Sequence, residues 1–103
     1  MSKPLGTAQL KVLEAIAGGT GYGFDVMDQT GLPSGSVYPA LSKLEKGGLV
    51  RSRWEAATLA RREKRPPRRY YEITALGREA LAGALVHVRD LARSLAKAVK
   101  ESG

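Results

Sequence analysis

The sequence predicts a mainly α-helical chain with one small β-hairpin and a long C-terminal helix. Three observations support this fold class. Apolar residues recur at helical spacing in three segments before residue 47, two strand-like segments follow, and a sustained apolar repeat occupies the chain after residue 73. The 103 residues are enough for one domain with one modest hydrophobic core.

The first three helices are expected over residues 7–17, 22–29 and 34–46. Apolar side chains fall on one face of each segment, and glycines end the three helices: Gly18-Gly19, Gly31 and Gly47-Gly48. Thr7 can serve as the N-cap of the first helix. Pro39 removes one backbone donor early in the third helix, which can bend its first turns but does not prevent it.

The two strand-like segments, residues 49–55 and 68–73, predict an antiparallel hairpin with residues 56–67 as its tip. Side chains alternate in the first segment, and Tyr70 and Tyr71 favour extended geometry in the second. Three helices followed by a strand, a basic loop and a strand are the order of a winged helix-turn-helix. Residues 1–73 are therefore expected to form a winged-helix domain, with the hairpin as its wing.

Residues 74–103 are expected to form a C-terminal dimerisation helix that begins at Thr74 as N-cap. Its apolar seam alternates spacings of four and three residues and consists of Leu81, Leu85, Val88, Ala92, Leu95 and Val99. A helix of about 26 residues is about 39 Å long, more than one small core can cover. The surplus stripe is expected to pack against the same helix of a second chain. The alternatives are a helix folded back on its own domain, or an end that frays past Leu91.

Positive charge is concentrated in the expected wing. The net charge of the chain is +7, and residues 51–69 contribute +6 of it through eight basic and two acidic side chains. A local excess of this size indicates a polyanionic partner, most simply nucleic acid. The alternative is a basic loop without a function.

Several classes of protein are disfavoured by what the sequence lacks. Without cysteine it can form neither disulfides nor thiolate metal sites. No apolar run approaches the roughly 20 residues that span a bilayer, and no signal peptide is visible, so we expect a cytoplasmic protein without a membrane partner. No nucleophile constellation or phosphate-binding loop appears, so we expect neither an enzyme nor a cofactor. The single histidine, His87, cannot form a metal site alone and is expected to be exposed or packed between chains.

Short motifs spread over the winged-helix segment occur together in one known family. They are Gly21-Tyr22-Gly23, Gly35-Ser36-Val37-Tyr38-Pro39-Ala40-Leu41, Leu44-Glu45, Gly48-Leu49-Val50, Trp54-Glu55, Arg69-Tyr70-Tyr71, Ile73-Thr74 and Gly77. In this combination residues 5–90 resemble the PadR family, the phenolic-acid-responsive repressors and their relatives. The resemblance implies a homodimeric, sequence-specific transcriptional regulator, usually a repressor, on a pseudo-palindromic double-stranded DNA operator. The single terminal helix is similar to the short branch of that family.

The third helix is expected to enter the major groove. A helix there needs short polar residues near its N-terminus so that the backbone can approach the DNA. The expected contacts of the helical part are Tyr22, Ser34, Gly35, Ser36, Tyr38, Ser42 and Lys43. The alternatives are that the serines only cap the helix, that Tyr38 packs partly in the core, and that Lys43 is only a solvated surface residue.

The wing needs long cations that reach phosphates or the minor groove. The expected contacts are Arg61, Arg62, Lys64, Arg65 and Arg68, with Pro66 and Pro67 stiffening the return. Arg51, Arg53, Arg68 and Arg69 lie in the strands, where some are expected to pair with acids.

Two other functions stay open at this stage. A winged helix can serve as a protein-interaction adaptor, although an adaptor has little need of a strongly basic wing. The chain can also be a ligand-responsive sensor that binds a planar aromatic compound at the dimer interface. Trp54, the only tryptophan, is a candidate for that cavity, but we expect it to pack within the hairpin.

Overall fold

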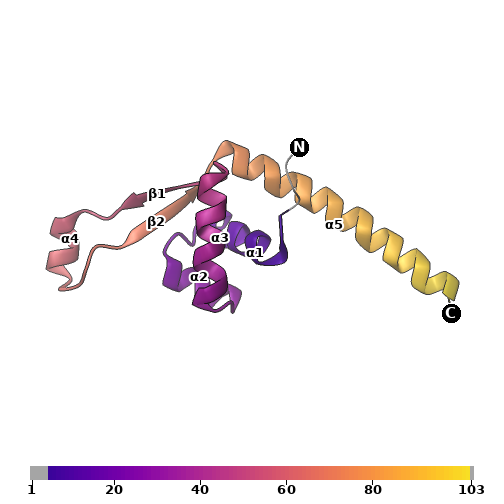
Figure 1. Cartoon of the computed structure of the whole chain (residues 1–103), viewed down its shortest axis with the longest axis horizontal. Helices are drawn as coiled ribbons and strands as arrows, with labels where there is room; N and C mark the ends of the chain where they lie inside the picture. The colour runs from indigo at the N-terminus through magenta and orange to yellow at the C-terminus, as the bar shows by residue number, and fades with distance from the viewer. Residues whose placement is uncertain (1–4, 103) are drawn as a thin grey trace.

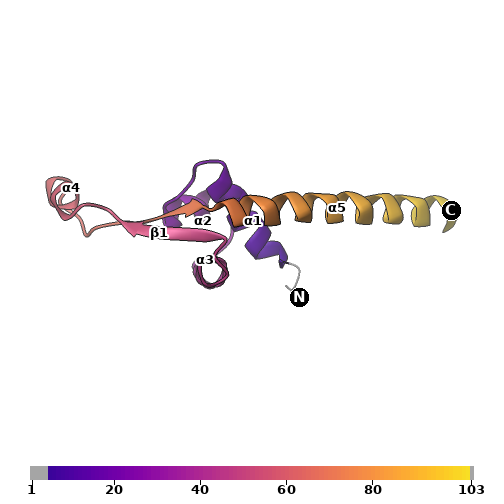
Figure 2. The ribbon, with the colours of Figure 1, turned by 90° about the horizontal axis from the view of Figure 1, so that it is seen from above.

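The computed structural model describes residues 5–102 of the chain (Figure 1). Three helices form its body: α1 (Thr7–Ala17), α2 (Gly23–Thr30) and α3 (Ser34–Lys46). The strands β1 (Val50–Trp54) and β2 (Arg69–Ile73) form a hairpin that carries α4 (Ala57–Arg62) at its end, and α5 (Ala75–Ser102) follows. The hairpin and α5 leave the body in opposite directions, so the molecule is elongated, 62 × 27 × 20 Å (Figure 2).

This arrangement confirms the predicted winged helix. The two strands are antiparallel, with Val50 opposite Ile73 and Trp54 opposite Arg69. The segment before α2 joins the hairpin edge, because the Tyr71 N–H donates to the Gly21 carbonyl at 2.8 Å. A Cβ at Gly21 would lie 2.7 Å from the Tyr71 carbonyl oxygen, so only glycine allows this close approach.

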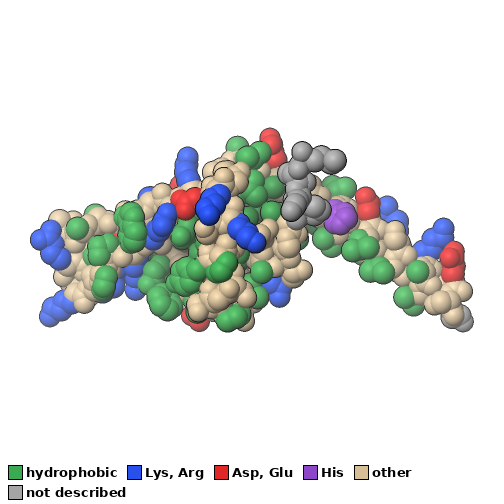
Figure 3. All heavy atoms as spheres, in the orientation of Figure 1, with side chains coloured by type: hydrophobic (Ala, Val, Ile, Leu, Met, Phe, Trp, Pro, Cys, Tyr) green, Lys and Arg blue, Asp and Glu red, His purple; other side chains and the backbone are tan. Residues whose placement is uncertain are grey.

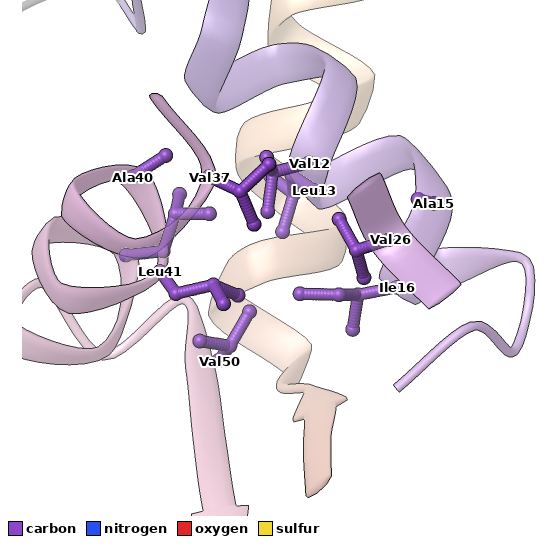
Figure 4. Packing of buried hydrophobic residues seen from close by; sticks show 10 residues of the cluster. Val12, Leu13, Ala15, Ile16, Val26, Val37, Ala40, Leu41 and Val50 are labelled. Atoms are coloured by element: carbon purple, nitrogen blue, oxygen red, sulfur yellow. The ribbon is translucent and has the colours of Figure 1, made fainter. Parts of the chain in front are cut away.

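The hydrophobic core lies between α1, α2, α3 and the start of β1 (Figure 4). Its fully buried side chains are Val12, Leu13, Val26, Val37, Leu41, Leu44 and Val50. Leu13, Val26, Val37, Leu41 and Leu44 come from the predicted apolar faces, whereas Val12 was not expected in the core. Each such side chain stabilises the fold by about 1.5–3 kcal/mol relative to an exposed position. The core therefore fixes α3 and the base of the hairpin on one small body.

Each of the first four helices is followed by a residue with positive φ. Three are glycines, Gly19, Gly31 and Gly48, which matches the predicted glycine stops. The fourth is Lys64, with φ +55° after α4. Its N–H donates to the Arg61 carbonyl, and the next N–H reaches the Ala60 carbonyl at 3.1 Å, which closes the helix in a Schellman motif. A non-glycine residue in this left-handed conformation is strained by about 1 kcal/mol.

Local details differ from the sequence prediction. The tip of the hairpin is not a plain loop, because Ala57–Arg62 forms α4 and buries Ala60. Thr7 is the first helical residue and not the N-cap, since Gly6 holds that position and its N–H donates to Gln9 Oε1 at 3.4 Å. The helix α2 begins and ends one residue later than residues 22–29.

The long terminal helix is confirmed. Thr74 caps it, because its Oγ1 accepts a hydrogen bond from the Gly77 N–H at 3.0 Å. The helix continues to Ser102, so it neither frays past Leu91 nor folds back on the body (Figure 1). Its 28 residues extend about 42 Å. Within residues 5–102, no helix combines the length and apolar character needed to cross a membrane.

Candidate nucleic-acid interface

The basic residues of the hairpin strands are paired with acids, as the sequence predicted for some of them. Arg51 Nη2 and Arg53 Nε lie 3.3 and 3.2 Å from the two carboxylate oxygens of Glu72. Hydrogen bonds from these two guanidinium groups hold the pKa of the Glu72 carboxyl below its usual value. The pairs are exposed, so they contribute little to stability, but they neutralise much of the charge along the strands.

Arg69 connects the hairpin to α3. Its Nη2 lies 2.9 Å from Glu45 Oε1 and donates to Ser52 Oγ at 2.8 Å. The same guanidinium lies 5.7 Å from the Trp54 ring and 5.6 Å from the Tyr71 ring. The Arg69 side chain therefore fixes the angle between the hairpin and α3, and its charge is already matched by a carboxylate.

Arg65 has a different environment from the one expected for a free phosphate contact. Its Nη1 and Nη2 lie 2.6 and 2.9 Å from the two oxygens of Glu55, and only 24% of its side chain is exposed. The Arg65 hydrogen bond holds the pKa of the Glu55 carboxyl below its usual value. Phosphate binding by Arg65 stays a prediction, but one edge of its guanidinium is already occupied within the wing.

Four cations of the wing form no salt bridge with any described residue: Arg61, Arg62, Lys64 and Arg68. The first three are exposed at the C-terminal end of α4, where they also face the negative end of the helix dipole. Basic side chains are accordingly visible at the outer end of the hairpin (Figure 3). Arg68 is held differently, because its guanidinium carbon lies 4.4 Å from the centre of the Tyr22 ring.

The N-terminus of α3 is exposed and open. Pro33 is the N-cap and no side chain caps the helix, so the interpretation of Ser34 as a capping residue is wrong. Ser34 and Gly35 are exposed, and their N–H groups belong to the first turn, which has no acceptor within a helix. These groups can therefore hold a phosphate or another acceptor from outside the protein.

Neither the backbone conformation nor the packing at Gly35 requires a glycine. Its φ is not positive, and a Cβ built on it meets no atom within 4 Å. Glycine within a helix costs about 1 kcal/mol relative to alanine. Four residues later, Pro39 lacks the N–H that would otherwise bond the Gly35 carbonyl. The first turn of α3 thus presents bare backbone, with a free carbonyl as well as free N–H groups.

Tyr38 is partly exposed and partly packed against the body. Its side chain is 43% exposed, yet its ring packs against the start of α2, where a Cβ on Gly23 would lie 2.9 Å from Tyr38 Oη. Ser42 and Lys43 are exposed one turn further along α3. The expected contact residues of α3 are therefore all accessible, at least in part.

A groove of about 540 Å³ separates the hairpin from α2 and α3. Three candidates line it: Tyr22 just before α2, Tyr38 in α3 and Arg68 just before β2. Trp54 also lines the groove and is 65% exposed, so its expected packing within the hairpin amounts to the contact with Arg69. The structure thus brings Tyr22, Tyr38 and Arg68 around one groove, and α3 projects from one side of the body (Figure 2).

Two features of the interface were missed by the sequence prediction. One is α4, which holds the basic tip in a helix. The other is Glu55, which binds Arg65 inside the wing. The only sequence signal for Glu55 is that an acid stands beside the single tryptophan in a strongly basic segment.

Residues 12–83 match the family described as Transcriptional regulator PadR-like family. The matched segment contains α2, α3 and the hairpin, together with most of α1 and the first turns of α5. No curated protein sequence matches this chain at a significant level.

Solved structures share the fold at low sequence identity. A PadR family transcription regulator from Clostridium difficile has a TM-score of 0.77 and 20% identity, covering 91% of this chain and 99% of that one. A PadR family transcriptional regulator from Eggerthella lenta has a TM-score of 0.76 and 22% identity, with coverages of 90% and 81%. A PadR-like transcription factor from Bacteroides fragilis has a TM-score of 0.73 and 20% identity, with coverages of 86% and 86%.

Proposed function

This chain belongs to the PadR-like family of transcriptional regulators, and on that basis we propose that it is a sequence-specific repressor that binds double-stranded DNA as a homodimer. In this proposal α3 of each protomer enters a major groove of a pseudo-palindromic operator. The wing contacts the flanking phosphates or the minor groove, and α5 joins the two protomers. The protein works in the cytoplasm and needs no cofactor.

The observation that carries DNA binding is the division of the wing cations. Four of the eight basic side chains form salt bridges with three acids of the same chain, Glu45, Glu55 and Glu72, and Glu72 is shared by Arg51 and Arg53. Arg61, Arg62 and Lys64 are left without an acid at the exposed tip. Because the other wing cations are paired with acids or, for Arg68, held against the Tyr22 ring, the tip is the part suited to an external polyanion.

Base recognition is assigned to α3. Its first turn offers two serines, free N–H groups and a glycine that packing does not require. A bare backbone allows close approach to the DNA, and short polar side chains suit phosphate or base edges. Ser42 and Lys43 extend the same exposed side of the helix.

Dimerisation through α5 is supported by surface area. One protomer exposes 7394 Å², whereas a compact monomer of 11.0 kDa exposes about 5600 Å². The excess of about 1800 Å² per protomer exceeds the roughly 800 Å² that each partner buries in a standard interface. Five apolar side chains of α5 are 49–71% exposed: Leu85, Val88, Leu91, Leu95 and Val99. The predicted seam therefore offers a second chain the area that a stable dimer buries.

Titration of a labelled duplex at several salt concentrations tests this function, with the DNA upstream of the protein's own gene as the first probe. If Arg61, Arg62 and Lys64 bind phosphates, replacing all three by alanine makes the plot of log K against log salt less steep, by about 2.7 in slope. Affinity at 0.15 M salt then falls about a hundredfold. The matched control replaces Arg51 and Arg53, which are paired with Glu72, and loses much less.

The absence of duplex binding at low salt by the unmodified protein contradicts the proposal and favours a protein-interaction adaptor. Repression is tested separately by transcription from the bound promoter, which falls when the protein is added. Stimulation of transcription would reverse the sign of the regulation without affecting DNA binding.

A ligand response is a second candidate, favoured by the groove between the hairpin and α3. Tyr22, Phe24, Tyr38, Trp54 and Tyr71 line it with aromatic rings. In contrast, α5 contains no Phe, Trp or Tyr, so it supplies no aromatic ring to a ligand cavity at the dimer interface. Titration of planar aromatic compounds against Trp54 fluorescence tests this candidate, and a compound that both quenches Trp54 and releases DNA supports it.

A further inference from the structure

Glu55 is the one charged residue within residues 5–102 that is buried, and it lies in the most basic segment of the chain. Only 5% of its side chain is exposed. A buried carboxylate needs hydrogen-bond partners, and a negative charge in a DNA-binding element opposes phosphate binding. Its position therefore calls for a structural reason within the wing.

The contacts of Glu55 all cross to the returning side of the hairpin. Arg65 donates two hydrogen bonds to its carboxylate, at 2.6 and 2.9 Å. The backbone N–H of Arg68 lies 3.4 Å from Oε1, and Tyr70 Oη lies 3.5 Å from Oε2. The backbone N–H of Glu55 in turn donates to the Arg68 carbonyl at 2.8 Å. One acid thus joins the end of β1 to three residues on the far side of α4.

Arg65 contacts both Glu55 and α4. Its side chain binds Glu55, while its backbone N–H closes α4 by donating to the Ala60 carbonyl. The helix α4 has only six residues, which is too short to persist without tertiary contacts. The buried methyl group of Ala60 is its only buried side chain. The pair between Glu55 and Arg65 is therefore the main polar contact that holds α4 to the hairpin.

We propose that Glu55 is a positioning residue of the wing: by binding Arg65 it orders α4 and holds Arg61, Arg62 and Lys64 in one arrangement toward the DNA. This inference rests on the proposed DNA-binding function. From charge alone, removing an acid should make the wing more positive and strengthen DNA binding. The inference predicts the opposite, because loss of Glu55 disorders the cations and weakens binding. Three long cations that are ordered in advance lose less entropy when they meet phosphates.

The test compares Glu55→Gln with Glu72→Gln in the full chain. Both changes remove one acid from the same hairpin and keep the size of the side chain, but Glu72 is exposed and pairs with strand arginines. We expect Glu55→Gln to weaken duplex binding about tenfold and to lower its salt slope. We expect Glu72→Gln to bind as tightly as the unmodified protein or more tightly. Equal affinities of the two variants, or tighter binding by Glu55→Gln, would overturn the inference.

Hydrogen exchange of the free protein gives a readout that does not depend on DNA. With Glu55→Gln, amides of α4 and of Arg65 exchange at least about tenfold faster, while those of α1 and α3 keep their protection. Unchanged exchange in α4 overturns the positioning role even if DNA binding falls. If the unmodified protein does not bind duplex DNA at all, the proposed function is overturned instead, so the two failures can be distinguished.

Arg65→Gln provides an independent variant should Glu55→Gln not fold, because the Arg65 side chain is less buried. It is expected to reproduce the loss of affinity and the faster exchange in α4. The double variant Glu55→Gln/Arg65→Gln is expected to lose no more than either single change, because both break the same contact. Additive losses would overturn the inference and assign Arg65 a phosphate contact of its own.

Discussion

Two arms extend from the three-helix body in opposite directions, the hairpin with α4 on one side and α5 on the other (Figure 2). The hairpin is held by contacts within one chain: strand pairing, the ion pairs of Glu55 and Glu72, and the link from Arg69 to α3. In α5 the only salt bridge is an exposed one between Asp90 and Arg93, and its apolar stripe is open to solvent.

The contrast indicates how the two proposed tasks are divided. An arm with internal contacts can be ordered before it meets DNA, which lowers the entropic cost of binding. An arm with an uncovered apolar stripe is stabilised only when another surface covers it. A single protomer should therefore present a formed wing, whereas the spacing of two wings on an operator should depend on a second chain.

The largest expected effect comes from placing charge on the stripe. In the proposed dimer, replacing Leu85 and Leu95 by aspartate would remove two leucines per protomer from the interface, and we expect it to weaken association by at least about 4 kcal/mol, or roughly a thousandfold. Sedimentation equilibrium measures this shift. The matched control, Val86→Asp, changes an exposed residue of α5 outside the predicted seam and should leave association nearly unchanged. Unaltered association of the double variant would place the interface elsewhere.

The junction between the arms should be the most sensitive point for folding. At Gly77 a Cβ would lie 2.0 Å from the Leu49 carbonyl oxygen, so Gly77→Ala must displace α5. We expect the free energy of unfolding to fall by about 3 kcal/mol in urea titrations. Gly83, in the same helix, has no atom within 4 Å of such a Cβ, and Gly83→Ala should raise stability by about 1 kcal/mol. Effects of the same sign at both positions would contradict this account.

Lys64 separates the strain of the wing from its charge. Lys64→Gly should relieve about 1 kcal/mol of left-handed strain and also remove one phosphate contact, which lowers duplex affinity about fivefold at 0.15 M salt. Lys64→Ala should lose the same affinity without gaining stability, because alanine keeps the strain. Thermal unfolding and duplex titration distinguish the two variants, and a stability gain with alanine would argue against strain at this position.

The smallest expected effect is that of pH. Stability should not change near neutral pH, and the response to acid should be confined to the hairpin. The pKa values of Glu55 and Glu72 are lowered in the folded chain, chiefly by hydrogen bonds from Arg65 and from Arg53. Their stabilisation is thus complete above the ordinary carboxyl pKa of about 4.3 and is lost as the pH falls through the lower folded values. Trp54 fluorescence should change below about pH 4 and stay constant between pH 6 and 8. A transition near neutral pH would contradict this assignment.

Most of the fold could be predicted because its signals are local and repeated. The bounds of α1 and α3 match the predicted segments, since each has a periodic apolar face and a glycine stop. The seam of α5 was visible for the same reason. In contrast, α4 has six residues, too few to show a period, and its arginines hid the helical character of Ala57–Arg62.

The contacts within the wing could not be predicted from the sequence, because they depend on how the tip folds. Glu55 and Arg65 are ten residues apart and meet only because α4 turns the chain back. Arg51 pairs with Glu72 because the strand register places them opposite each other. Composition gave the right total charge, but only the three-dimensional structure separates the neutralised cations from the free ones.

The turn at Thr74 connects the two arms rigidly. Thr74 donates to the Leu49 and Gly48 carbonyls at 3.0 and 2.6 Å, so the end of α3, the hairpin and the start of α5 move together. A helix of about 42 Å that is anchored this way acts as a lever. A tilt of about 10° at the turn moves its far end by about 7 Å, roughly two base-pair steps of DNA. Small changes in how two such helices cross would therefore become whole-step changes in the operator spacing that a dimer accepts.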